Sequence, residues 1–344
     1  PTLEAAGGGV CVADVFVKPS VARKRLEADV VLGNATAQAA SGEIHWEAVN
    51  DDTGQVGRVF APQPFEVAAG QTRTISLGEA WSDPELWWPD APHLYRLRLT
   101  LSVGGESADV SETRFGFREW RCEGTKFTLN GVVWRLWADL VGERRSPEDW
   151  LESYRRTHQR VMRLSTAGQG GQDSRWLGLE PQEALEFCDR NGIVVRRNTT
   201  LDGEAIGYHF SEPDPETRKR QGGSELKLAL MRNWRHQCVA QVRGERNHPS
   251  IQVWSIENEF AFINLINLLG NSETMDRYEE EIARTHEAVM AVDPTCSVMI
   301  DGGGALKNNT LGVAGDHYVA TLDGRYPDLA YEPFVEGGGR GRWR

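Results

Sequence analysis

Asn258 and Glu259 are two polar residues at the end of a short apolar run, and their side chains could carry acid–base chemistry. The run, Ile251–Ile256, is typical of a buried strand, and a turn at Pro249 separates it from a long helical segment. A carboxylic acid there can protonate the leaving oxygen of a glycosidic bond, and a neighbouring amide can hydrogen-bond the sugar 2-OH. The dipeptide alone also fits a loop cap, so its interpretation depends on the elements that position it.

Short apolar strands alternate with amphipathic helices from about residue 117 onward, which favours parallel strands with helical crossovers. The expected strands are Val133–Leu140, Val161–Ser165, Ile193–Arg197, Ile251–Ile256, Ser297–Ile300, Gly312–Val319 and Pro333–Val335. One expected helix begins after Ser146. Three others cover Glu183–Arg190, Glu225–Gly244 and Ser272–Val292. Seven or eight such units close into a (β/α)8 TIM barrel, whose active-site groups lie at the carboxyl ends of the strands. An open doubly wound sheet has a similar pattern, but no glycine-rich nucleotide motif follows the first strand.

Residues 1–115 show no helical period and predict an antiparallel β-sandwich of immunoglobulin type. Leu26–Leu32 and Leu94–Val103 alternate apolar residues with others, and Asp51–Gly54 supplies a turn. The expected domains are therefore a β-sandwich over 1–115 and a catalytic TIM barrel over 116–344. The barrel is either complete or truncated at its carboxyl end, since no eighth strand is recognisable.

The composition excludes several classes of partner. The chain of 344 residues has a formal net charge of −12, which disfavours binding to nucleic acid. It contains no long apolar run and no basic amphipathic stretch, so we expect a soluble protein without membrane attachment. Its five cysteines lie at wide spacings without a Cys/His cluster, so we expect no metal site and no cofactor.

Three segments resemble one known family. The run Arg246–Glu259 resembles the acid/base signature of glycoside hydrolase family 2, which contains β-galactosidases, β-glucuronidases and β-mannosidases. Leu86–Tyr95 resembles the family's sandwich-domain motif, and Arg114–Glu119 with Phe127–Gly131 resembles its junction between sandwich and barrel. The resemblance runs from about residue 10 to at least residue 320. It implies a retaining hydrolase that cleaves β-glycosidic bonds of oligo- or polysaccharides with two carboxylates and no cofactor.

The resemblance also implies roles for single residues. It makes Glu259 the general acid/base and places the nucleophile at the end of the seventh strand. Glu336 is the nucleophile candidate within this chain, and the alternative is a residue beyond position 344.

The remaining candidates are substrate-binding residues. Asn258 precedes the acid/base, and Arg163 matches the arginine that supports the nucleophile, whose ionised form a cation favours. His317 and Tyr318 end the sixth strand, where the family holds residues that contact the nucleophile or the sugar.

Departures from the family pattern keep an alternative open. The segments Leu136–Leu140 and Ser165–Gly168 differ from the usual strand ends, and Glu257 stands where glycine is usual. The alternative is a carbohydrate-binding protein that keeps the fold but has lost hydrolysis. A barrel hydrolase with Glu257 and Glu259 as metal ligands is disfavoured because no paired histidines lie nearby.

The sequence does not identify the sugar, the linkage or the oligomeric state. The compartment is also open, with the bacterial periplasm or the extracellular space favoured over the cytoplasm. Three Asn-X-Thr patterns, which begin at Asn34, Asn198 and Asn308, match glycosylation acceptors but are too short to imply secretion.

Overall fold

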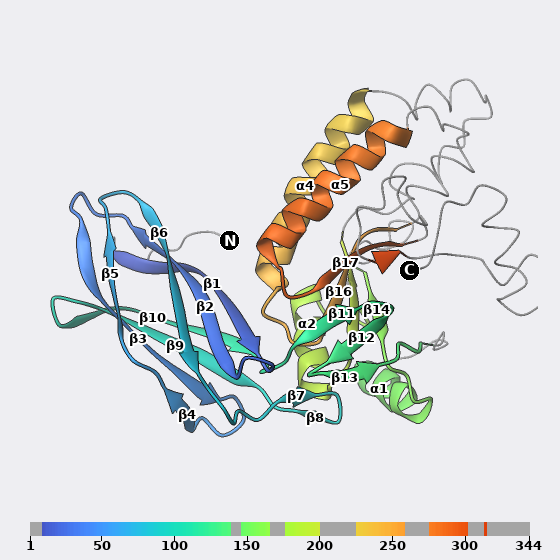
Figure 1. Ribbon diagram of the computed structural model, residues 1–344, viewed down its shortest axis with the longest axis horizontal. Coiled ribbons are helices and arrows are strands. Elements are labelled where there is room, and N and C mark those ends of the chain that lie inside the picture. Colours follow the sequence, from blue (N-terminus) through green and yellow to red (C-terminus); the bar gives the residue numbers. More distant parts are fainter. Residues whose placement is uncertain are drawn as a thin grey trace, which may run out of the picture.

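The computed structural model of the chain describes residues 9–138, 146–165, 176–199, 225–258, 275–301 and 313–314. Figure 1 shows an amino-terminal region built only of strands beside a second region in which helices accompany strands. In these ranges no helix is both long and apolar enough to cross a membrane.

The amino-terminal region is a β-sandwich, as the alternating residues predict. One sheet has the order β1-β2-β6, and the other has the order β10-β9-β3-β4 with β5 also paired to β3. Their bounds are β1 Val10–Ser20, β2 Arg25–Asn34, β3 Ala40–Asn50, β4 Val56–Val59, β5 Gln63–Val67, β6 Thr72–Ala80, β9 Tyr95–Val103 and β10 Glu106–Phe115. Leu26, Ala28, Val30 and Leu32 of β2 are completely buried, because alternate residues of a strand point into the space between the sheets.

A short hairpin lies between β6 and β9, and a small three-stranded sheet follows β10. β7 (Trp87–Trp88) pairs with β8 (Ala91–Pro92), and β11 (Trp120–Glu123), β12 (Lys126–Leu129) and β13 (Val132–Trp134) form an antiparallel meander. The expected parallel strand Val133–Leu140 is therefore wrong at its start, because Val132–Trp134 pairs back onto β12. Beyond it, the backbone oxygen of Trp137 accepts from Arg160 and Val161, and residues 139–140 lie outside the described ranges.

The second region contains a parallel sheet of order β14-β15-β16-β17-β18. The strands are β14 Met162–Leu164, β15 Val195–Asn198, β16 Ile251–Asn258, β17 Ser297–Asp301 and β18 Val313–Ala314, and the helices are α1 Pro147–Arg156, α2 Pro181–Asn191, α4 Glu225–Glu245 and α5 Met275–Val292. The alternation of strands and helices is confirmed. The expected strand Pro333–Val335 lies outside the described residues, and closure into a barrel stays a prediction. The domain boundary after residue 115 also stays a proposal, at the point where β10 ends.

Helix ends follow the local signals that the sequence contains. Ser146 caps α1, since its hydroxyl accepts from the backbone N–H of Asp149 at 3.2 Å. Gly192 ends α2 in the left-handed conformation, with φ of 66°. A Cβ at Gly192 would lie only 1.9 Å from the backbone oxygen of Pro89, so this glycine also allows α2 to approach the β7–β8 hairpin.

We predict that Gly192→Ala destabilises the protein more than a matched glycine substitution does. Gly124 also has a positive φ, of 61°, but nothing lies within 4 Å of the Cβ it would gain. Gly124→Ala should cost about 1–2 kcal/mol for the left-handed backbone alone. Gly192→Ala should cost roughly 2–4 kcal/mol, because Pro89 must also move. Urea unfolding measures both, and equal losses would show that the α2–hairpin contact is loose.

Candidate active site

The carboxyl ends of four parallel strands meet at one edge of the sheet. β14 ends just before Ser165, β15 ends at Asn198, β16 at Asn258 and β17 at Asp301. The register pairs Leu164 with Arg197, Asn198 with Ser255, and Asn258 with Asp301. Polar residues therefore collect at this edge, where parallel α/β folds hold their ligands.

The helices α1, α2, α4 and α5 of the described residues cover one face of the sheet, and apolar side chains fill the space between. Met162 and Leu164 of β14, Trp254 and Ile256 of β16, and Ile300 of β17 belong to one buried cluster with residues of all four helices. The indole Nε1 of Trp254 also donates to Asp293, just after α5, at 2.8 Å.

Arg197 is the one completely buried cation of this face within the described strands. Its Nε and Nη2 each donate to the carboxylate of Glu245 on α4 at 2.7 Å, and its Nη1 donates to the oxygen of Leu164 at 3.2 Å. A bidentate pair with an added hydrogen bond compensates the desolvation of both charges. Arg197 thus ties α4 to β14 and β15, and it serves the scaffold.

The opposite face of the sheet, here called the inner face, carries several polar side chains. Because side chains alternate along a strand, the residues between the helix-facing ones must lie on it. The polar ones are Arg163 on β14, Arg196 and Asn198 on β15, and Ser255 and Glu257 on β16, and the buried apolar residues Val253 and Met299 lie on the same face. Arg163 and Arg196 are direct partners in the register, so two cations stand next to each other. Glu257, which is completely buried, contributes a carboxylate to the same face.

The structure brings two of the predicted site residues to this region. Asn258 is the last residue of β16 and is only 4% exposed, and Arg163 lies on the inner face of β14 with an exposed side chain. Glu259, His317, Tyr318 and Glu336 lie outside the described residues. The roles of all six residues stay predictions.

Asn198 is a further candidate site residue, which the sequence analysis did not name. It is 1% exposed, and among the described residues neither its amide nitrogen nor its amide oxygen has a hydrogen-bond partner. Burial of an unpaired amide costs free energy, so such a group at the carboxyl edge of the sheet is a candidate for binding a ligand. The sequence signal that could have identified it is its position directly after the expected strand Ile193–Arg197. The glycosylation pattern that begins there is not usable, because the amide nitrogen is buried.

Asn34 provides the structural counterpart of Asn198. It too begins a glycosylation pattern and is 2% exposed, but its amide nitrogen donates to the oxygens of Gln38, Val67 and Ala68 at 2.8–3.3 Å. Both buried asparagines begin an Asn-X-Thr pattern, but within the described residues the amide of Asn34 has hydrogen-bond partners and that of Asn198 has none.

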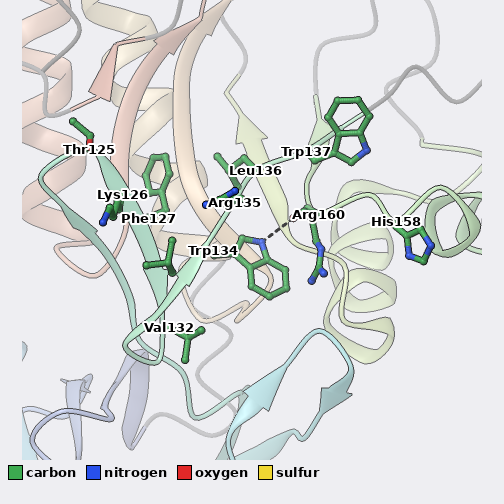
Figure 2. Close-up of a pocket in the computed structure, with 11 residues that line it drawn as sticks. Thr125, Lys126, Phe127, Val132, Trp134, Arg135, Leu136, Trp137, His158 and Arg160 are labelled. Atoms are coloured by element: carbon green, nitrogen blue, oxygen red, sulfur yellow. Dashed lines mark hydrogen bonds between the residues drawn. The ribbon is translucent and has the colours of Figure 1, made fainter.

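A separate hollow lies at the other end of the sheet. Figure 2 shows it between the β12–β13 hairpin and the segment before β14. Its volume is about 1140 Å³. The Nε1 of Trp134 donates to the backbone oxygen of Arg160 at 3.0 Å, and the Arg160 guanidinium lies 4.9 Å from the Trp134 ring centroid. Because Arg160 precedes β14, this hollow is at the amino end of the sheet and is distinct from the candidate site.

In the described part of the chain, no group of three or more His, Cys, Asp or Glu side chains is placed to hold a metal ion. The five cysteines are free thiols, as their spacing suggests. Burial raises the pKa of Cys238 and of Cys296 to about 12, so both are neutral at physiological pH.

Two sequence profiles of one family match the chain. The profile described as "Glycosyl hydrolases family 2" matches residues 10–118, and the one described as "Glycosyl hydrolases family 2, TIM barrel domain" matches residues 180–330.

Two relatives with glycosidase names each match more than half of this chain. A β-galactosidase of Priestia megaterium is 26% identical over 208 residues, which are 58% of this chain and 19% of that protein. A putative β-glucuronidase of Formosa agariphila is 27% identical over 205 residues, which are 59% of this chain and 18% of that protein. The chain thus spans about a fifth of the length of these relatives.

Solved structures share the fold. A glycosyl hydrolase family 2 member from Bacteroides cellulosilyticus superimposes with a TM-score of 0.66 at 18% identity, over 94% of this chain and 41% of that one. A β-galacturonidase from Eisenbergiella tayi, bound to galacturonate, has a TM-score of 0.64 at 17% identity, over 97% of this chain and 56% of that one.

We predict opposite stability changes for two Asn→Leu substitutions. Asn198→Leu should raise the free energy of unfolding by about 1 kcal/mol, because it removes an unpaired buried amide. Asn34→Leu should lower it by roughly 1–3 kcal/mol, because three backbone oxygens lose their donor. Denaturant unfolding of both variants measures the changes, and a loss of stability in Asn198→Leu would contradict the view that this amide has no structural partner.

Proposed function

The chain belongs to glycosyl hydrolase family 2, and on this premise we propose that it carries the acid/base half of a retaining β-glycosidase site. The observation that carries the proposal is the position of Asn258, which ends a fully buried parallel strand and directly precedes Glu259. A carboxylic acid that follows a barrel strand is in the position from which such enzymes protonate the leaving group.

The proposed reaction has two displacements. Glu259, protonated at the start, donates its proton to the glycosidic oxygen while a second carboxylate attacks the anomeric carbon and forms a glycosyl–enzyme ester. Glu259, now ionised, then removes a proton from water, which attacks the same carbon and releases the sugar. Glu336 is the candidate nucleophile within the chain, with a residue beyond position 344 as the alternative.

The inner face supports this assignment electrostatically. A nucleophilic carboxylate must be ionised, and a cation nearby lowers its pKa. Arg163 and Arg196 form a pair of cations on neighbouring strands of this face. We propose that they keep the nucleophile ionised and that Asn258 hydrogen-bonds the sugar, with His317 and Tyr318 completing the site.

The proposed substrates are β-linked sugars of oligo- or polysaccharides. The names of the relatives include galactosidase, glucuronidase and galacturonidase, which cover a neutral sugar and two acidic ones. The unpaired amide of Asn198 can donate to one hydroxyl group and accept from another, which suits any sugar.

We predict that Glu259→Gln selectively slows substrates with poor leaving groups. Alkyl glycosides need protonation and should lose about 10²–10⁴-fold in kcat/KM. Dinitrophenyl glycosides leave without protonation, so their glycosylation step should change little. Steady-state kinetics on both substrates of the full-length protein measure the difference. The matched control is Glu43→Gln, at an exposed position of β3.

A chemical rescue tests retention directly. Azide added to Glu259→Ala should attack the glycosyl–enzyme and yield a β-glycosyl azide, identified by NMR. An α-glycosyl azide, or full activity of Glu259→Gln on alkyl glycosides, would refute the assignment. If the unchanged protein binds oligosaccharides without turnover, the carbohydrate-binding alternative holds.

Asn198→Leu tests the proposed sugar contact through ligand-induced stabilisation. The free sugar product should raise the melting temperature of the unchanged protein but raise that of Asn198→Leu much less. Gln252→Leu is the control, because Gln252 also has a buried amide without partners but lies near the amino end of β16. If the sugar raises the melting temperature of both variants and of the unchanged protein equally, a sugar contact at Asn198 is excluded.

A further inference from the structure

The turn Arg246–Ser250, between α4 and β16, contacts the sandwich at several points. It contains the first part of the segment that resembles the family's acid/base signature, yet it lies at the amino end of β16, far from Asn258. Its side chains therefore have a role other than contact with the substrate.

Arg246 joins the sandwich to the helical region. Its Nη2 donates to the carboxylate of Asp14 on β1 at 2.6 Å, and its guanidinium lies 4.3 Å from the ring centroid of Phe16. Its Nη1 donates to the oxygen of Val292, the last residue of α5, at 2.9 Å. The Arg246 side chain is only 10% exposed, so solvent screens this ion pair less than a surface pair.

Asn247 continues the hydrogen-bond pattern of a sheet edge. β1 is an outer strand of its sheet, so one side of its backbone is not paired to another strand. The amide oxygen of Asn247 accepts from the N–H of Val17 at 2.9 Å, and its amide nitrogen donates to the oxygen of Val15 at 2.8 Å. One side chain thus binds two backbone groups of a strand 230 positions away.

His248 anchors the turn to α2. Its Nδ1 lies 2.5 Å from the carboxylate of Asp189, and its Nε2 lies 3.0 Å from the amide nitrogen of Gln182. A ring with its proton on Nδ1 satisfies both contacts. Asp189 also accepts from the N–H of Ser250 at 3.1 Å, and its backbone oxygen accepts from the indole of Trp87 at 2.9 Å.

Pro249 packs against the junction segment that follows the sandwich. Its backbone oxygen accepts from Arg118 Nε and from Trp120 Nε1, both at 3.3 Å. A Cβ at Gly116 would lie 2.7 Å from the Cβ of Pro249 and 2.8 Å from that of Trp87, so only glycine fits between them.

We propose that the turn Arg246–Ser250 couples the sandwich to the parallel sheet and, by holding the start of β16, positions Glu259 for proton transfer. These five residues are positioning residues, since none of them lies at the carboxyl edge of the sheet. The catalytic part of this inference rests on the proposed function, and the coupling of the two regions does not.

The structure supplies a reason why β16 needs such an anchor. Its ladder with β15 has a register shift between Val195 and Arg196, and its ladder with β17 has one between Ser255 and Asn258. The neighbouring ladders are thus interrupted at both ends of β16, which is eight residues long and buried throughout. A displacement of the start of a buried strand passes along it, and a shift of about 1 Å at a reacting group can cost roughly 10²-fold in rate.

Hydrogen exchange of the full-length protein tests the coupling without any substrate. Asp14→Asn changes only the sandwich side of the Arg246–Asp14 pair. We expect the β16 amides to exchange roughly tenfold faster in this variant, as loss of a charge-assisted hydrogen bond should allow. Arg23→Gln is the control, because it breaks an exposed ion pair with Glu27 inside the sandwich and should leave β16 unchanged. Unchanged β16 exchange in Asp14→Asn and in Asn247→Ala would overturn the coupling.

The dependence on the leaving group tests the positioning. In Asn247→Ala, kcat/KM for alkyl glycosides should fall by roughly 10²-fold, while kcat/KM for dinitrophenyl glycosides, which reports the glycosylation step alone, should fall less than tenfold. KM for the alkyl glycosides should change little, because the turn does not contact the sugar. If the substitution merely unfolds part of the protein, the active fraction falls and the rates with both substrates fall equally. That result would overturn the positioning role. Glu259→Gln distinguishes the two failures, since only the proposed function predicts its selective effect on alkyl glycosides.

Discussion

The buried carboxylate of Asp189 is the constraint on which the arrangement of this chain depends. It is 1% exposed on α2, and a carboxylate withdrawn from water must be paired or protonated. Burial lowers the pKa of His248, but the neighbouring carboxylate of Asp189 raises it, and the net direction is upward. Through His248 and Ser250, Asp189 holds the start of β16, and through its backbone oxygen it holds Trp87. One residue thus fixes a helix, a parallel strand and the β7–β8 hairpin together.

A small apolar cluster excludes water from the same junction. Trp87 and Leu94 come from the sandwich region, Trp120 and Leu129 from the meander, and Val194 directly precedes β15, and all five are buried. Such exclusion strengthens the hydrogen bonds between the buried polar groups. The junction also requires glycine at positions 116 and 192, because neighbouring backbone or side-chain atoms leave no room there for a Cβ.

The two faces of the parallel sheet differ in how their polar groups are satisfied. On the helix-covered face, Arg197 is fully paired with Glu245 and Leu164, so its charge stabilises the scaffold. On the inner face, the amide of Asn198 has no hydrogen-bond partner within the described part of the chain. A buried amide left unpaired makes the protein less stable than it could be, which is common at sites that bind ligands.

The sequence by itself determined the elements whose signals are local. The Ser146 cap and the left-handed Gly192 act within a few residues, so the helices α1, α2, α4 and α5 and the strands β14 to β17 were predicted near their observed bounds. The strand Ile251–Ile256 was predicted for the same reason, and β16 extends two residues further, to Asn258. The pairing of Val132–Trp134 with β12, the burial of Asn198 and the docking of Asn247 on β1 were decided only by the tertiary structure. Each depends on which distant groups compete for a hydrogen bond or a space, and no local pattern encodes that competition.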